Sequence, residues 1–355
     1  MLMPEAKKIL LIQLGDIGDV IWTTPTLWAV KKAYPQAEVS ILVKEGYGAL
    51  LAEDPSLDKV IEVRGYRGGL LRRGREHCRF LRSLRKERFS LVIDLRAGDR
   101  GAFLTYLTGA PMRVALLYRK GVPFWRNWVF THLIEPKLLE KKTRGAAEQS
   151  LRIIRGLGIE PCETAPRLWV SEEVDRRVRE LLQREKIPGS GRWITLNPFS
   201  RWAYKEWSLE RWSRVIDWLG DEYQIATVIT GSPEEQERAN DLVKKCHRGV
   251  LNLAGKTSLA ELAGLLRSSS LHIGVDSAAP HIAAAVGTCT ITLYGPSDWF
   301  DWAPVGEKHK FIFPDKECAP CHRKGCQDEG WSQCLDELQV EKVQAAIREI
   351  LDQAA

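Results

Sequence analysis

Short apolar runs alternate with segments of helical periodicity along almost the whole chain of 355 residues. In the first half, runs typical of buried strands occur at residues 8–14, 37–43, 60–63, 91–95 and 112–116. No hairpin signal joins one run to the next. Because a strand that returns through a helix pairs parallel to its predecessor, this pattern predicts the α/β class with parallel sheets.

A second alternating series follows residues 159–166, a stretch of weak periodicity that has the character of a linker. Its expected strands lie at residues 193–196, 224–229, 250–253 and 271–275. We therefore predict two Rossmann-like domains that face a cleft, residues 1–165 and 166–337, a division that suits the length. An amphipathic helix within residues 338–355 is expected to pack back toward the first domain.

The composition is that of a globular protein, with 44% hydrophobic and 28% charged residues. No apolar run reaches membrane-spanning length, and the run near the N-terminus is too short for a signal peptide. These features predict a cytoplasmic protein with reduced cysteines.

Basic residues are concentrated in the first half of the chain. Residues 1–165 carry 28 Lys and Arg against 18 Asp and Glu, whereas acidic residues are in excess in residues 166–355. The basic excess peaks at residues 64–88, where leucines and Phe80 predict a helix with one apolar side. This helix is either a solvated surface or a contact surface for nucleic acid, anionic lipid or a phosphorylated glycan. No nucleic-acid-binding motif accompanies it.

Residues 268–295 predict a strand, a tight turn, a helix and a second strand. Asp276 and Ser277 are good N-cap residues, and Pro280 falls in the first turn, where its missing N–H costs nothing. A helix N-terminus at the carboxyl edge of a strand is a natural phosphate site, with His281 one turn away. The alternative is an ordinary crossover with a core histidine.

The glycine-containing loop of residues 13–25, QLGDIGDVIWTTP, follows the first predicted strand. Gly15 and Gly18 allow a tight turn, but they form neither a dinucleotide fingerprint nor a P-loop. Asp16 and Asp19 are acidic residues where a phosphate site would have none. Asp19 is either a helix cap or a general base that takes a proton from a hydroxyl.

Two loops of the second domain carry further candidates. Ser200, Arg201 and Lys205 precede a helix that Ser208 caps, and cationic side chains there suit a diphosphate. Glu235 follows a strand and could bind ribose hydroxyls, or simply favour the start of its helix.

In this order, the motifs LGDIGD, NPFSRWAYKEW, ITGS and GVDSAAPHIAAAVG followed by YGP resemble the heptosyltransferases, the family 9 glycosyltransferases. The resemblance covers nearly the whole chain. It implies the two-domain GT-B fold and transfer of L-glycero-D-manno-heptose from ADP-heptose to the lipopolysaccharide inner core. It further implies inversion at the anomeric carbon without a catalytic metal or other cofactor.

The resemblance also implies roles for particular residues. Asp19 would be the general base and Lys205 the catalytic lysine at the donor diphosphate. Glu235 would contact ribose and Thr257 would lie beside adenine. The remaining donor-binding positions are Ser200, Arg201, Asp276, Ser277, Ala278 and His281. Two of these depart from the family pattern, since Ala278 replaces a common glycine and Arg201 replaces a threonine of some members.

The acceptor implied by the resemblance is phosphorylated Kdo–lipid A, with or without one heptose, and it would suit the basic first domain. Candidate acceptor-binding residues are Gly15, Asp16, Gly18, Arg64 and Arg67. The same surface is expected to rest on the anionic inner face of the inner membrane, with no nucleic-acid partner. Alternatives are a GT-B transferase for another nucleotide sugar, a related epimerase and a non-catalytic nucleotide-binding scaffold.

Four of the eight cysteines cluster in a loop before the last helix, Cys318, Cys321, Cys326 and Cys334. Their spacing matches no standard zinc knuckle or ribbon, but four thiolates could hold a structural Zn²⁺. The alternatives are reduced thiols and a local disulfide. No D-x-D pair suggests a metal at the diphosphate.

Overall fold

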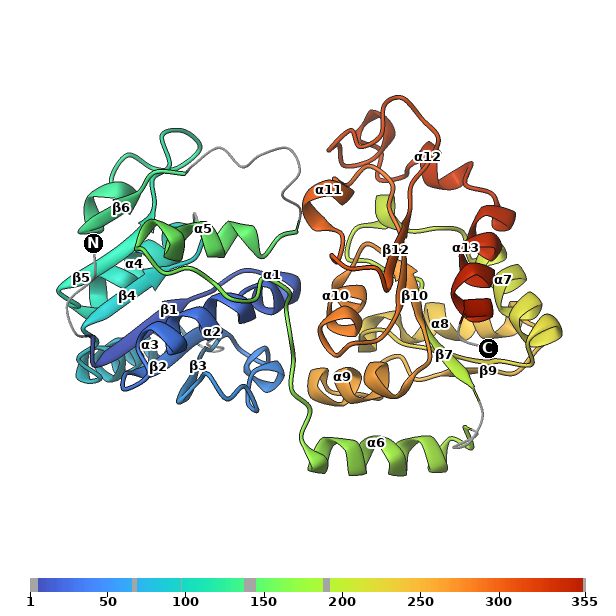
Figure 1. The fold of residues 1–355 in the computed structure, drawn as a ribbon, viewed down its shortest axis with the longest axis horizontal. Helices are drawn as coiled ribbons and strands as arrows, with labels where there is room; N and C mark the ends of the chain where they lie inside the picture. The colour runs from blue at the N-terminus through green and yellow to red at the C-terminus, as the bar shows by residue number, and fades with distance from the viewer. Residues whose placement is uncertain (1–5, 66–68, 97, 137–144, 188–191, 354–355) are drawn as a thin grey trace. The chain divides into compact units, whose positions relative to one another are not determined.

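A computed structural model describes residues 6–65, 69–96, 98–136, 145–187 and 192–353. The chain divides into two compact units, Met1–Trp169 and Val170–Ala355 (Figure 1). The division lies four residues beyond the predicted end of the first domain.

The described residues of the first unit form a six-stranded parallel sheet in the order β3-β2-β1-β4-β5-β6. Chain order reverses between β1 and β4, which makes the gap beyond their carboxyl ends the topological switch point, where such sheets bind ligands. The predicted parallel sheet is confirmed, and β6 is a strand that the sequence did not predict. The strands are β1 (Lys8–Ile12), β2 (Glu38–Lys44), β3 (Lys59–Val63), β4 (Leu91–Asp94), β5 (Met112–Leu116) and β6 (His132–Ile134).

The segment that follows β1 forms two helices, α1 (Ile17–Trp22) and α2 (Thr24–Ala33). They break at Thr23 because Pro25 has no N–H to continue the first helix. The basic segment forms α3 (Leu70–Lys86), whose Leu84 is buried in the core as its periodicity predicted. The remaining helices are α4 (Asp99–Thr108), α5 (Glu148–Gly156) and the 3-10 turns η1 (Gly48–Leu50) and η2 (Arg126–Val129).

The second unit repeats this topology. Its described residues form a parallel sheet in the order β12-β11-β10-β7-β8-β9, which, counted from β7, is the strand order of the first unit. Its switch point therefore lies between β7 and β10. Strand β12, at the edge, was not predicted. The strands are β7 (Trp193–Asn197), β8 (Ala226–Ile229), β9 (Val250–Asn252), β10 (His272–Val275), β11 (Thr290–Leu293) and β12 (His309–Ile312).

The last helix, α13 (Val340–Gln353), packs on α7 (Leu209–Glu222) and β12, with Val343 and Ile347 fully buried in the core of the second unit. Its predicted contact with the first unit stays a prediction. The other elements are α6 (Glu172–Arg184), η3 (Ala203–Lys205), η4 (Pro233–Glu235), α8 (Gln236–Lys245), α9 (Leu259–Ser268), α10 (Ala278–Ala285), α11 (Trp299–Trp302), η5 (Cys326–Asp328) and α12 (Gln333–Asp336). Within the described ranges, no helix combines the length and apolar character needed to cross a membrane.

Candidate functional site

The loop between β1 and α1 fixes the carboxylate of Asp19. Asp16 is the N-cap of α1, and its backbone N–H donates a 2.7 Å hydrogen bond to Oδ2 of Asp19. A Cβ atom on Gly15 would lie 2.1 Å from the same oxygen, so only glycine fits there. Lys44 pairs with Asp16 at 3.1 Å. The capping role of Asp19 is thus confirmed, and the loop also directs its carboxylate to the switch point of the first sheet.

The other oxygen of Asp19, Oδ1, accepts a charge-assisted hydrogen bond from the guanidinium of Arg96, which follows β4. The Asp19 side chain is only 12% exposed. Burial raises the pKa of Asp19 above its usual value, while the charge of Arg96 opposes that rise. A partly desolvated carboxylate of this kind is suited to general base catalysis. Sequence reasoning missed Arg96, although its place directly after a buried strand was a usable signal.

Behind Arg96 lies a fully buried ion pair. Asp94, at the end of β4, is 3.5 Å from the guanidinium of Arg126, and neither side chain is exposed. Arg126 also donates to the carbonyl of Arg96 at 2.8 Å, and its guanidinium lies 5.0 Å from the centre of the Tyr118 ring and 5.0 Å from that of the Phe130 ring. Burial raises the pKa of Asp94 to about 7, against the opposing charge of Arg126. The Asp94–Arg126 pair therefore holds in place the backbone at Arg96, whose side chain contacts Asp19.

In the second unit, the switch point brings together three of the predicted donor residues. Nζ of Lys205 is 2.6 Å from Oδ2 of Asp276, which follows β10. The hydroxyl of Ser200, which follows β7, donates to the carbonyl of Asp276 at 3.3 Å. The side chains of Lys205 and Asp276 are largely buried. Asp276 thus holds the ammonium group of Lys205 at the edge where β7 and β10 end.

Of the two predicted N-cap residues, Ser277 is the N-cap of helix α10, and Ala278 is the first residue of that helix. The hydroxyl oxygen of Ser277 is buried and finds no hydrogen-bond partner among the residues described here. His281 is also buried. Burial lowers its pKa to about 4, and Lys205 adds to this effect while Asp276 opposes it. At neutral pH His281 is therefore an uncharged imidazole, and Lys205 supplies the positive charge beside the helix N-terminus.

Glu235 serves as a helix cap. Its Oε2 accepts a 2.7 Å hydrogen bond from the backbone of Ser232, in the capping box of η4. The loop after β9 lies beside it, because the N–H of Gly255 donates to the carbonyl of Gly231 at 2.9 Å. Thr257 follows in that second loop. The ribose and adenine roles of Glu235 and Thr257 stay predictions.

The loop of Ser200 has a further support that the sequence analysis missed. Glu206 accepts the N–H of Ser200 at 2.9 Å and pairs with Arg238 of α8. The guanidinium of Arg238 lies 4.8 Å from the centre of the Phe199 ring. Arg201 is exposed in the same β7–α7 connection.

Four of the five predicted acceptor residues lie at the carboxyl edge of the first sheet. Gly15 and Asp16 belong to the β1–α1 loop and Gly18 to the first turn of α1. Arg64 is exposed directly after β3, at the same carboxyl edge. Arg67 lies outside the described residues.

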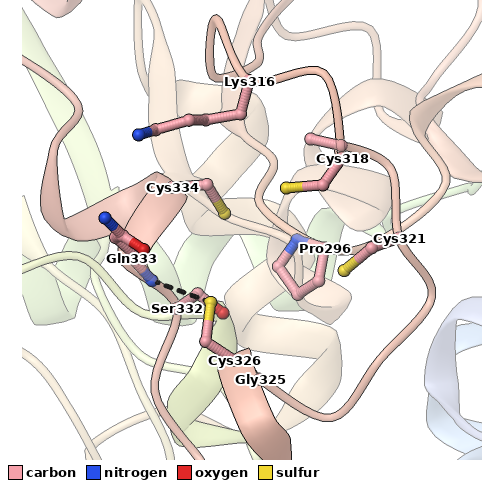
Figure 2. Close-up of a pocket in the computed structure, with 10 residues that line it drawn as sticks. Pro296, Lys316, Cys318, Cys321, Gly325, Cys326, Ser332, Gln333 and Cys334 are labelled. Carbon is pink, nitrogen blue, oxygen red and sulfur yellow. Dashed lines mark hydrogen bonds between the residues drawn. The ribbon is translucent and has the colours of Figure 1, made fainter.

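The four clustered cysteines line one small cavity of about 40 Å³, with their sulfur atoms directed inward (Figure 2). All four are free thiols. Burial, with a smaller contribution from Cys326, raises the pKa of Cys334 to about 11, so this thiol is protonated at neutral pH. In the described parts of the chain, no group of three or more Cys, His, Asp or Glu side chains is arranged to hold a metal ion.

Several known proteins that this chain resembles in sequence and in structure are of one kind. The chain is 28% identical over 295 residues to lipopolysaccharide heptosyltransferase 3 of Escherichia coli K12, covering 82% of this chain and 83% of that protein. A family 9 glycosyltransferase from Veillonella parvula superposes with a TM-score of 0.82 at 22% identity, covering 98% and 97% of the two chains. E. coli heptosyltransferase WaaC with ADP-2-deoxy-2-fluoro heptose gives 0.73 at 20% identity, covering 96% and 99%. The fold is therefore the GT-B fold of these enzymes.

A more distant structure, the iron-containing dodecameric glycosyltransferase TibC of enterotoxigenic E. coli, is 14% identical with a TM-score of 0.61 and shares the fold alone. The superposition covers all of this chain and 78% of TibC. The family model of glycosyltransferase family 9 (heptosyltransferase) matches residues 77–332, most of the sequence. The chain is a glycosyltransferase and belongs to family 9, the heptosyltransferase family.

Proposed function

We propose that the protein transfers L-glycero-D-manno-heptose from ADP-heptose to the lipopolysaccharide inner core, with inversion at the anomeric carbon. The observation that carries this proposal is the Lys205–Asp276 pair at the N-terminus of α10, which offers a diphosphate an ammonium group beside the N–H donors of a helix. The family and the names of its relatives support heptose as the transferred sugar.

Asp19 is the general base of the proposed reaction. As an acceptor hydroxyl attacks the anomeric carbon, its proton passes to the carboxylate of Asp19, and the bond from that carbon to ADP breaks with its electrons on the diphosphate. The charge of Arg96 favours the ionised form of Asp19 and so opposes the rise in its pKa that burial causes. The carboxylate is thereby held ready to accept a proton at neutral pH.

Lys205 and the start of α10 stabilise the leaving diphosphate. An ammonium group has three N–H donors, and Asp276 engages one of them, which leaves two for phosphate oxygens. The Ser277 hydroxyl and the first backbone N–H groups of α10 add donors with the positive end of a helix dipole. Losing one such donor costs about 3–4 kcal/mol of transition-state stabilisation in sites of this kind. In this proposal no catalytic metal takes part.

The acceptor in this proposal is phosphorylated Kdo–lipid A, either bare or already carrying one heptose. The excess of ten positive charges in residues 1–165 suits its phosphates and carboxylates. We place the enzyme in the cytoplasm, in peripheral contact with the inner face of the inner membrane, and we expect no nucleic-acid partner.

Calorimetric titration with ADP, UDP and GDP, without added metal, tests the donor class. We expect selective binding of ADP, and Lys205→Ala should weaken it. Selective binding of UDP or GDP would leave the fold intact and overturn the proposed donor. Failure of all three nucleotides to bind would favour a non-catalytic scaffold.

Turnover with ADP-heptose and Kdo–lipid A tests the chemistry. Asp19→Asn should abolish transfer and leave ADP affinity nearly unchanged, because Asp19 belongs to the first unit and the diphosphate site to the second. Equal losses of affinity and activity would contradict this division of roles.

A further inference from the structure

Four large aromatic side chains are exposed on two contacting parts of the first unit. Phe103 and Tyr106, on α4, are 53% and 57% exposed. Phe124 and Trp128, in the connection between β5 and β6, are 78% and 77% exposed, and their rings meet edge to face at 5.5 Å. We call these four residues the aromatic patch. Exposed rings that cluster in this way mark an interaction surface more often than scattered ones do.

The four residues of the patch come from two elements of the first unit that contact each other. Helix α4 packs on η2. Arg113 bridges them, because its guanidinium lies 5.9 Å from the centre of the Tyr106 ring and its Nε donates to the carbonyl of Val129 at 2.7 Å. Val129 directly follows Trp128. Phe103 and Tyr106 are one helical turn apart on the same face of α4.

Exposed basic side chains lie near the aromatic patch in the sequence and on the neighbouring helix α3. Arg100, Arg119 and Lys120 are exposed beside it in the sequence. On the other side, α3 packs against α4, and the guanidinium of Arg85 lies against Gly109, the C-cap of α4. Helix α3 presents its remaining arginines to solvent, among them Arg79 and Arg82.

We propose that the aromatic patch and the exposed arginines of α3 dock on an anionic lipid bilayer. Phe and Trp side chains favour the headgroup level of a membrane, where their rings bury apolar surface at the boundary between headgroups and acyl chains. Arginines beside them meet lipid phosphates. Charge complementarity selects this occupant, because the basic excess of this unit would oppose the docking of a second copy of the chain.

The docking surface is connected to the candidate base. The loop that carries Phe124 and Trp128 is anchored by Arg126, whose guanidinium meets Asp94 and the carbonyl of Arg96. Arg96 in turn contacts Asp19. A membrane-embedded acceptor would thus be presented close to the base. This last step rests on the proposed function, whereas the docking itself does not.

Flotation with lipid vesicles tests the docking. Wild-type protein should bind vesicles of phosphatidylcholine with phosphatidylglycerol, more weakly at high salt, and bind phosphatidylcholine alone poorly. Phe124→Ala/Trp128→Ala and Arg79→Gln/Arg82→Gln should each weaken binding about tenfold. The matched control Trp331→Ala removes an exposed tryptophan of the second unit and should bind as wild type.

Three results would overturn the docking proposal. They are unchanged vesicle binding by Phe124→Ala/Trp128→Ala, equal losses in Trp331→Ala, and light scattering that shows a dimer lost only when the aromatic patch is removed. Quenching of tryptophan fluorescence by brominated lipids should also be weaker in Trp128→Phe than in wild type. Heptose transfer to a soluble, deacylated acceptor separates the two proposals, because it should not depend on the aromatic patch.

Discussion

Replacing Arg126 by methionine should destabilise the first unit by about 3–5 kcal/mol at neutral pH, the usual effect of removing one partner of a buried ion pair. The guanidinium is fully buried, lies 3.5 Å from Asp94, and donates to the carbonyls of Arg96 at 2.8 Å and Leu116 at 3.3 Å. Methionine fills similar space but leaves the carboxyl group and both carbonyls without this donor.

The loss should also depend on pH. The pKa of Asp94 is about 7 in the folded protein, above its usual value of 3.8. A raised folded-state pKa means that the unfolding free energy falls as pH rises from the unfolded-state pKa to the folded-state pKa, and then levels off. Without Arg126 the folded-state pKa is higher still, so the fall continues above pH 7 by up to about 1.4 kcal/mol per pH unit. The difference between variant and wild type should therefore be larger at pH 8 than at pH 6.

Urea unfolding at both pH values measures the change in stability. Hydrogen exchange in peptides from β4 and η2 then assigns that change to the first unit. In the Asp94→Asn background, Arg126→Met should cost the same at pH 6 and pH 8, because no titrating carboxyl group remains beside the guanidinium. Arg119→Met, which removes an exposed arginine of the same connection, should change stability by less than about 0.5 kcal/mol. A difference that is equal at pH 6 and pH 8 would refute the reasoning.

Three further predictions concern the active site and the cysteines. Arg96→Met should move the acid limb of the pH profile of kcat/KM for heptose transfer to higher pH. The proposed reaction needs ionised Asp19, and without the charge of Arg96 the pKa of Asp19 is higher, so activity is lost at a higher pH. An unmoved acid limb would count against Asp19 as the base. Gly15→Ala should lower kcat without changing ADP affinity measured by calorimetry, because its Cβ would displace the Asp19 carboxylate; full activity would contradict this. Metal analysis of protein purified without chelator should find no stoichiometric zinc at the four-cysteine cavity. One bound equivalent of zinc would show that the four cysteines are metal ligands and not free thiols.

The sequence predicted the central strands of both sheets because each is a continuous apolar run buried on both faces. The edge strands β6 and β12 were missed for the opposite reason. They have one neighbouring strand each, and β12 reads HKFI, with two basic residues in four. An edge strand can keep polar side chains in solvent, so its apolar pattern is too weak to identify it.

Of the candidate site, the sequence could predict polar residues in the loops and first helical turns that come after a strand, such as Asp19, Lys205 and Asp276. It could not predict Arg126. This arginine lies 30 residues beyond Arg96, in an irregular connection that gives no local sign of burial. Its partner Asp94 is identified only when the ends of β4 and β5 are brought together in space.

Both carboxylate oxygens of Asp19 are engaged, one by Arg96 and the other by the backbone N–H of Asp16. In the proposed mechanism, a proton accepted by Asp19 must therefore weaken one of these bonds. If it binds at Oδ2, the first turn of α1 loses its cap in each catalytic cycle and regains it when the proton leaves. The amide proton of Asp16 would then be a built-in spectroscopic reporter of the charge state of the base, readable by its chemical shift during a pH titration.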